Sequence, residues 1–473
     1  MKILLINAPR EVLQKPAFPP LGLASIGAIA SEEGHEIVIV DAADWDWPRL
    51  KQKISDVNPE LVGLTCWTIE RGQCFRTAHL VREVAPQAKI VVGGPHATAF
   101  PGHIFIKTPA DYVVKGEGEE TFRELLKALD SGKDIRRVRG LAYRNGETYT
   151  LTELRQLIQD LDKLPNIIHS QFAYDNYGGL HDTYLKSAAV ITSRGCPFNC
   201  SFCSSAVYWG NKYRTRSVAN VIREVESLYH DHGIRALLFF DDNLTIDRSR
   251  CLALSSALTD LKLDLVWAAE GSVKVDRELL AAMKLAGCYR LDFGVESGSP
   301  DVLKRINKPF SVDDTKRAFD LCRETGIRPN AYLIIGSPGE TRESVSQTVR
   351  LMRDIQPDVC TPNPGIWILP DTDLYRMSLQ QGIINEKDFL ASDSTFIYTG
   401  EHSLSELESL RNLFARGMAL GLGLVPYLRV VASQMFHSGL LKTAIILKVL
   451  RIFMRRQPLN DIQCCCCKKD IQV

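Results

Sequence analysis

The chain has 473 residues, of which 45% are hydrophobic and 24% are charged. At about 100–200 residues per domain, this length suggests two to four domains with enough apolar residues for a large core. The 57 Lys and Arg residues nearly balance the 56 Asp and Glu residues, and the resulting charge of +1 excludes a generic polyanion binder and a largely disordered chain, so we expect no nucleic-acid partner.

An apolar stretch that is typical of a buried strand begins at residue 2, and it is too short for a secretory signal peptide. We therefore expect a cytoplasmic protein. The chain also contains 13 cysteines. Because disulfides are rare in the cytosol, we expect these cysteines to be thiols or metal ligands.

The first 130 residues alternate short apolar runs with segments of helical spacing, such as residues 21–34 and 76–85. This alternation predicts a Rossmann-like parallel sheet with helices on both faces. Ligands of such sheets bind beyond the carboxyl ends of the strands, at the point where the strand order reverses. The apolar runs are residues 3–7, 36–41, 61–66, 89–93 and 112–115.

Two glycine-containing segments follow predicted strands of this first domain. Glycines there let the backbone approach a ligand closely, or they simply form tight turns between a strand and a helix. A G-x-G-x-x-G fingerprint is missing after the first strand, which disfavours a dinucleotide. The two segments contain Gly93, Gly94, Pro95 and His96, and Gly116, Glu117, Gly118 and Glu119.

Residues 131–186 are more polar and are expected to form a linker with a hairpin at residues 140–149, turning at Asn145-Gly146 in a type I′ turn. Residues 187–382 then repeat strand–helix units, with helical patterns at 218–230, 277–286 and 312–325. Such repeats predict a full or partial parallel barrel whose chemistry lies at the carboxyl ends of its strands. The predicted strands are residues 188–192, 236–240, 265–269, 291–295, 331–335 and 365–369.

Three cysteines follow the first predicted barrel strand at C-x₃-C-x₂-C spacing: Cys196, Cys200 and Cys203. Three close thiolates on a loop suit a cuboidal iron–sulfur cluster, and a [4Fe–4S] cluster with three protein ligands keeps one iron open for catalysis. The alternative, a zinc site, needs a fourth ligand, and the next histidines, His230 and His232, lie on a predicted helix.

Acidic residues follow three of the predicted barrel strands: Asp241, Glu270 and Glu296. Because the carboxyl ends of barrel strands share one face, we expect these side chains to meet beside the cysteine loop. One acid alone is explained by helix capping, but three at successive strand ends argue against that explanation.

These motifs together resemble the cobalamin-dependent (class B) branch of the radical S-adenosylmethionine (SAM) enzymes. The resemblance covers roughly residues 1–382 and implies a cobalamin-binding domain at 1–130 followed by a partial (β/α)6 radical SAM barrel at 187–382. It rests on the three cysteines and on residues 19–23, 93–96, 116–119, 240–243, 293–298 and 335–341.

The resemblance implies three cofactors, a [4Fe–4S] cluster, SAM and cobalamin, and an external one-electron reductant of the flavodoxin or ferredoxin type. In the family, the reduced cluster cleaves SAM to a 5′-deoxyadenosyl radical, which takes a hydrogen atom from an unactivated carbon. By position, Asp241 and Asp242 would lie near the SAM amino group, Glu296 near the ribose, and residues 336–339, with Gly336 and Pro338, against the adenine. Many relatives carry a basic residue near Glu270 and Ser272, so the contact of this strand with SAM is an open point.

The D-x-H-x-x-G motif that supplies a cobalt-ligating histidine is absent, which implies cobalt without a protein histidine. We hypothesise that Trp67 or Thr68, just after the strand that contains Thr65, covers the lower face of cobalamin. The alternative is that Trp67 packs under the first helix.

Methyl transfer to an unactivated carbon, or to a phosphinate, of a small-molecule or lipid-like substrate is the leading function. The alternatives are a cyclase or oxidoreductase of the same architecture and a non-catalytic sensor. Residues 383–473 are expected to be mostly helical. Within them, residues 440–456 form either a helix at a membrane surface or a packed helix, and Cys464 to Cys467 suggest acylation, metal capture or a disordered tail.

Overall fold

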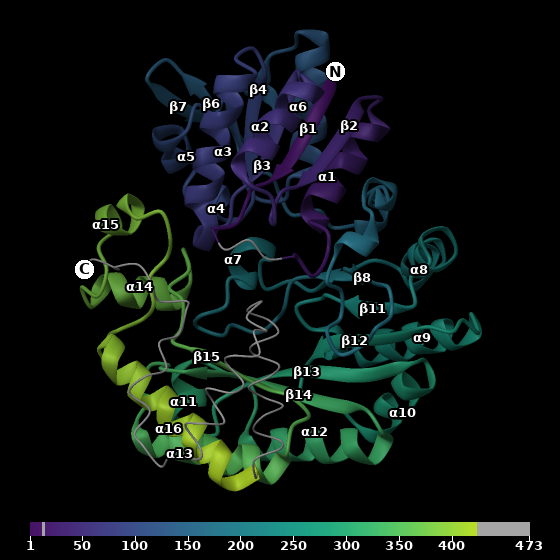
Figure 1. Cartoon of the computed structure of the whole chain (residues 1–473), viewed down its shortest axis with the longest axis vertical. Coiled ribbons are helices and arrows are strands. Elements are labelled where there is room, and N and C mark those ends of the chain that lie inside the picture. Colours follow the sequence, from purple (N-terminus) through teal and green to yellow (C-terminus); the bar gives the residue numbers. More distant parts are fainter. Residues whose placement is uncertain (12–14, 423–473) are drawn as a thin grey trace.

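The computed structural model describes residues 1–11 and 15–422. Two bodies, each built on a sheet, lie one above the other in Figure 1. The first body comes from the amino-terminal part of the chain. The helix α4 (Pro95–Ala99) of this body lies on the side that faces the second.

The first body has five parallel strands in the order β2-β1-β3-β4-β5. Residues 3–6 of β1 are at most 1% exposed because helices cover both faces of the sheet. The strand order reverses between β1 and β3, so this is the switch point where such sheets bind ligands. The elements are β1 (Lys2–Asn7), β2 (Glu36–Asp41), β3 (Leu61–Thr65), β4 (Lys89–Gly93) and β5 (Tyr112–Val114), with α1 (Leu21–Glu32), α2 (Trp47–Val57), α3 (Arg71–Val84), α5 (Pro101–Lys107) and α6 (Glu119–Ser131).

The expected hairpin adds two antiparallel strands, β6 (Leu141–Asn145) and β7 (Thr148–Leu151), to the edge at β5. Its turn differs from the prediction. Asn145 pairs with Thr148, so the two loop residues are Gly146 and Glu147. Only Gly146 has a positive φ, of 61°, whereas a type I′ turn needs a positive φ at both loop positions. The type I′ prediction at Asn145-Gly146 is therefore wrong, and a glycine at the first loop position fits type II′.

The second body is a sheet of six parallel strands that lie side by side in chain order, which makes a partial (β/α)6 barrel. Helices α8, α9, α10, α12 and α13 cover its outer face (Figure 1). The elements are β8 (Ser187–Val190), α8 (Val218–His232), β11 (Ala236–Phe239), α9 (Arg248–Asp260), β12 (Val266–Gly271), α10 (Arg277–Leu285), β13 (Cys288–Glu296), α11 (Pro300–Arg305), α12 (Val312–Thr325), β14 (Arg328–Ile335), α13 (Arg342–Ile355) and β15 (Cys360–Pro364).

The sixth barrel strand lies five residues before the predicted one. The structure places β15 at Cys360–Pro364, paired with β14, whereas residues 365–369 follow it and make only an isolated bridge between Trp367 and Ile397. Pro362 explains the error, because a proline within a run argues against a strand. An edge strand tolerates proline, since one of its sides needs no sheet partner.

Three further helices complete the described chain: α14 (Asp373–Gln380), α15 (Glu386–Ala391) and α16 (Leu404–Leu422). Arg71 of the first body donates from its guanidinium to the backbone oxygens of Phe389 and Ser392, and so joins α3 to the end of α15. Among the helices of residues 1–11 and 15–422, none is long and apolar enough to cross a membrane. The predictions for residues 440–456 and 464–467 fall outside the described residues.

Candidate functional site

The cysteine loop starts where β8 ends, at the barrel mouth. The backbone turns at Gly195, whose φ is 90°, and a side chain there would collide with the backbone oxygen of Lys212. Burial raises the pKa of the Cys203 thiol to about 11, and the backbone N–H of Ser205 opposes this shift. Burial also raises the pKa of Cys196 and Cys200. Each thiolate therefore needs a bound cation or cluster to be stable at neutral pH.

The surroundings of the three sulfurs fit an iron–sulfur cluster. A cavity of about 430 Å³ borders Cys200 and Cys203, so there is room beside the thiols. No group of three His, Cys, Asp or Glu side chains in the described ranges converges tightly enough for a single metal ion. A cuboidal cluster does not require such convergence, because each cysteine binds a different iron.

Asp241, just after β11, holds the start of the cysteine loop. Its carboxylate accepts hydrogen bonds from the backbone N–H and the hydroxyl of Thr192, at 2.8 and 2.9 Å, and from the backbone N–H and the hydroxyl of Ser193, the latter at 2.7 Å. Burial raises the pKa of Asp241, and these donors oppose the shift. Both oxygens are occupied within the protein, whereas Asp242 accepts the Gly195 N–H at 3.2 Å with one oxygen.

Glu270, at the end of β12, stands among other acids. Burial, followed by the carboxylates of Asp292 and Asp242, raises the pKa of Glu270 to about 7. Asp241 and Glu296 raise the pKa of Glu270 further, with smaller effects. The pKa of Glu270 in the folded state lies above its ordinary value of 4.5, so protonation of Glu270 stabilises the folded state at low pH. This stabilisation is lost as the pH rises through about 7.

Glu296 adopts a left-handed backbone, with φ of 61°, where the register of β13 against β14 shifts. Such a conformation is costly for a residue with a side chain and is concentrated at functional sites. The carboxylate of Glu296 accepts a 2.7 Å hydrogen bond from the buried ammonium of Lys308. A side chain at position 294 would collide with this carboxylate, which explains Gly294.

Lys308 has no sequence signal and was missed by the sequence analysis. Burial lowers its pKa, but Glu296 and Cys200 outweigh burial, and the net pKa is raised. Lys308 is therefore a fixed positive charge between the cysteine loop and Glu296. It lowers the pKa of Cys200, in the direction that a thiolate ligand needs.

The segment after β14 is a buried turn at the carboxyl end of that strand. Gly336 and Gly339 both have positive φ, of 103° and 78°, and Pro338 lies between them. The hydroxyl of Ser337 is buried and lacks a hydrogen-bond partner among the described residues. Ser272, just after β12, is also buried; its N–H donates to Thr245 at 2.8 Å, and its hydroxyl accepts the Lys274 N–H at 3.1 Å. The unpaired Ser337 hydroxyl suits a polar atom at the edge of a purine, whereas the N–H groups of Gly336 and Gly339 already donate to Glu340 and Glu401.

A polar network inside the barrel was also missed by the sequence analysis. Asp292 of β13 accepts the side-chain amide of Asn330 at 2.7 Å and pairs with Arg290 at 3.0 Å. Arg290 in turn contacts Asp182 at 2.6 Å, and Tyr332 donates to Asp292 at 3.4 Å. Its members come from strands and a loop far apart in sequence, so spacing alone gives no signal for it.

At the switch point of the first body, Trp67 follows β3 and is 52% exposed, whereas Thr68 is buried. Gly94, with φ of 97°, packs its backbone against Thr65, at the end of β3, where a side chain would collide. Gly93, Pro95 and Gly118 lie in the same turns, and the Gly116 N–H donates to the Thr98 hydroxyl at 3.1 Å. Of the two residues in our hypothesis, only Trp67 offers its side chain to a ligand.

Three of the predicted ligand-binding side chains face protein groups. His96 is fully buried and bonds to His103 at 2.9 Å, and burial lowers the pKa of His96 to about 3, so it is neutral. Glu117 and Glu119 pair with Arg194, beside the cysteine loop, at 2.8 and 2.5 Å.

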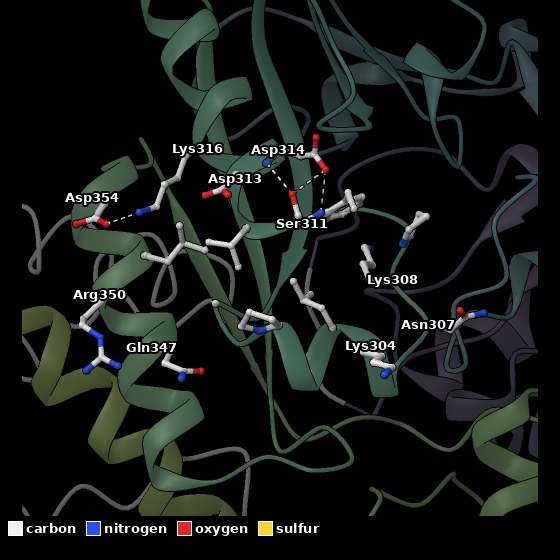
Figure 2. A pocket seen from close by; sticks show the side chains of 17 residues that line it. Lys304, Asn307, Lys308, Ser311, Asp313, Asp314, Lys316, Gln347, Arg350 and Asp354 are labelled. Carbon is white, nitrogen blue, oxygen red and sulfur yellow. Dashed lines mark hydrogen bonds and ion pairs between the residues drawn. The ribbon is translucent and has the colours of Figure 1, made fainter.

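A second cavity, of about 940 Å³, lies between α11, α12 and α13 on the helical side of the barrel (Figure 2). Two pairs of its polar side chains bond to each other, and another lining residue, Lys308, is paired with Glu296. Lys316 bonds to Asp354 at 2.8 Å, and Ser311 to Asp314 at 2.9 Å (Figure 2). We therefore place the chemistry at the barrel mouth and not in this cavity.

Comparison with known proteins supports both bodies. The radical SAM superfamily model matches residues 190–352, and the B12 binding domain model matches residues 15–126. The chain is 34% identical over 378 residues to a Pyrococcus horikoshii protein described as an uncharacterized methyltransferase, and the alignment covers 77% of this chain and 82% of that protein.

Two other proteins are informative. The chain is 29% identical to the anaerobic magnesium-protoporphyrin IX monomethyl ester cyclase of Rubrivivax gelatinosus, with 72% of this chain and 63% of the cyclase aligned. The fold of this chain is similar to that of TsrM from Kitasatospora setae, a radical S-adenosylmethionine methyltransferase solved with tryptophan and a SAM analog. The TM-score is 0.69 and the sequence identity is 22%. That alignment covers 80% of this chain and 76% of TsrM.

Proposed function

This chain belongs to the cobalamin-dependent radical SAM enzymes, and from that premise we propose that it transfers a methyl group to an unactivated carbon, or to a phosphinate, of a small or lipid-like molecule. The cofactors of the family are a [4Fe–4S] cluster, SAM and cobalamin. The observation that carries the proposal is the three-cysteine loop at the barrel mouth, which faces a B12-binding body.

When bound, these cofactors supply a 5′-deoxyadenosyl radical and a transferable methyl group. The chain supplies ligands, orientation and shelter from water. Cys196, Cys200 and Cys203 would hold the cluster, and Lys308 would offset part of the negative charge of their thiolates. The adjacent Gly195, with its backbone N–H on Asp242, fixes the direction in which the loop leaves the barrel.

SAM would lie across the barrel mouth. Asp242 would offer its carboxylate to the SAM amino group, whereas both oxygens of Asp241 are used by the cysteine loop, so we assign Asp241 to positioning. Glu296 would receive the ribose hydroxyls, and the backbone from Gly336 to Pro338 the adenine. Glu270, at the end of β12, and Ser272, just after it, lie where many relatives carry a basic residue. Glu270 is neutral below about pH 7, so it can donate a hydrogen bond to the SAM carboxylate.

Trp67 would cover the lower face of cobalamin, at the switch point and without a histidine ligand to cobalt. Replacing Trp67 with alanine is expected to change the absorption and EPR spectra of bound cob(II)alamin, because water would reach the cobalt. Tyr184, a fully exposed aromatic residue in the linker, provides the control as Tyr184→Ala. Spectra of Trp67→Ala that match those of the unaltered protein would refute this role.

The cyclase relative supports a second candidate function, ring closure or oxidation without net methyl transfer. Product analysis with methyl-labelled SAM and a reductant separates the candidates. Methyl transfer predicts both S-adenosylhomocysteine and 5′-deoxyadenosine, with label in the product. Formation of 5′-deoxyadenosine alone would favour the second candidate, and formation of neither compound would favour a non-catalytic sensor.

The partners that this function requires are a small-molecule substrate and an external one-electron donor. We propose a donor of the flavodoxin or ferredoxin type and a cytoplasmic location. The predicted membrane contact of residues 440–456 falls outside the described residues.

A further inference from the structure

Four charged side chains join the two bodies directly beside the cysteine loop. We infer that Glu117 and Glu119 of the first body are positioning residues that fix the cysteine loop, through Arg194 and Arg214, at a set place relative to the cobalamin-binding surface. We call these four residues the interdomain clamp. The inference rests on the proposed function only for the identity of the two cofactors that face each other.

The clamp is short and buried. Glu117 accepts from Arg194 at 2.8 Å and from Arg214 at 2.9 Å, and Glu119 accepts from Arg194 at 2.5 Å. All four side chains are at most 13% exposed. Burial lowers the pKa of Arg194, but Glu119 and Glu117 outweigh burial and raise it, so the pair stays charged.

The remaining bonds of the clamp fix its orientation. Glu117 also accepts the Ile158 N–H at 2.7 Å, and Arg214 donates to the Ile158 oxygen at 2.5 Å, so the clamp also binds the linker between the two bodies. Ser25 of α1 donates to Glu119 at 2.9 Å. Arg194 also lies over the ring of Trp209, at the end of α7 (Ser205–Trp209), 5.1 Å from the ring centre. Glu119 is thus also held from its own body, and Glu117 from the linker.

Arg194 transmits this position to the ligands because Gly195 alone separates it from Cys196. Arg194 lies in β9 (Ser193–Arg194), which pairs with β10 (Arg214–Thr215), so both arginines lie in one small sheet. Asp241 holds Ser193 from the barrel side, while the clamp holds Arg194 from the cobalamin side. Two consecutive residues thus connect the cysteine loop to the two halves of the active site.

Because the clamp consists of charged groups, it can fix the position of the cysteine loop relative to the first body as well as hold the two bodies together. An apolar contact is not directional, whereas carboxylate–guanidinium pairs impose both distance and angle. Removing one partner from a buried pair leaves an uncompensated charge, so the loop should shift to reach water or another partner. A shift on the order of 1 Å between reacting groups is enough to lower a rate about a hundredfold.

The test measures the separation of the two centres in the holoenzyme. A reduced [4Fe–4S] cluster speeds the electron-spin relaxation of nearby cob(II)alamin, and this effect depends steeply on the distance between the cluster and the cobalt. In Glu117→Gln we expect the relaxation enhancement to change by about twofold or more, for a displacement on the order of 1 Å. Iron and cobalamin content should remain those of the unaltered protein. Glu33→Gln, which weakens a partly buried pair with Arg123 inside the first body, is the matched control and should leave the relaxation unchanged.

Arg194→Lys provides a second variant, since it keeps the charge but loses the two-pronged contact. We expect its relaxation to lie between those of the unaltered protein and Glu117→Gln. The double variant Glu117→Gln with Arg194→Gln should differ little from Glu117→Gln alone or from Arg194→Gln alone, because coupled residues act as one unit. Unchanged relaxation in Glu117→Gln, or simple additivity in the double variant, would overturn the clamp. Absence of any coupling between the centres in the unaltered holoenzyme would instead contradict the proposed function.

Discussion

Replacing Cys200 with alanine is expected to abolish the iron–sulfur cluster. The cluster depends on three protein thiolates, and the loss of one leaves two irons without a protein ligand. Cys200 borders the cavity beside the loop, and the ammonium of Lys308 opposes the rise in the pKa of its thiol. We expect absorbance at about 400 nm and bound iron to fall by roughly tenfold after anaerobic reconstitution.

Cys322→Ala is the matched control for this change. Cys322 is buried on α12, on the outer side of the barrel, so its loss removes a thiol without touching the loop. Iron content should then stay at the level of the unaltered protein. Full cluster content in Cys200→Ala, or zinc in place of iron in the unaltered protein, would contradict the ligand assignment.

The fold was largely predictable because its strands are buried on both faces. The run from Ile3 to Ile6 and the strand at Glu36–Asp41 have no polar alternation that would suggest another structure. The predicted strand and turn positions were wrong where a single residue type usually indicates a different local structure. Pro362 conceals an edge strand, and Asn145 extends a strand where Asn-Gly pairs usually form the turn.

The site was predictable only where its residues are close in sequence. The cysteine spacing predicts a cluster site. The acids at the strand ends predict a shared site, because the barrel places the carboxyl ends of its strands on one face. Spacing does not show what a carboxylate contacts. Glu117 and Asp241 were predicted as cofactor contacts, and the structure shows both engaged with protein groups. Lys308 and Asp292 gave no signal at all, because their partners come from other strands or loops.

Removing the carboxylate of Asp241 is expected to have the largest effect on stability. In Asp241→Ala, two backbone N–H groups and two hydroxyls, from Thr192 and Ser193, lose their acceptor inside the protein. Buried donors without partners cost about 1–3 kcal/mol each, and some will rebind water, so we expect a total loss of about 3–5 kcal/mol. Equilibrium urea unfolding, followed by circular dichroism, measures this loss.

Two companion variants make the result specific to Asp241. Asp247→Ala removes an ordinary helix cap, the acceptor of the Arg250 N–H at 3.0 Å, and should cost only about 1 kcal/mol. Asp241→Asn keeps one acceptor oxygen and should lie between the two. Asp241 holds Ser193, and the clamp holds the next residue, Arg194. Without Asp241 the cysteine loop keeps only one of these two attachments, so Asp241→Ala should also lower cluster content. A cost no larger than that of Asp247→Ala would mean that the cysteine loop is held from the cobalamin side alone.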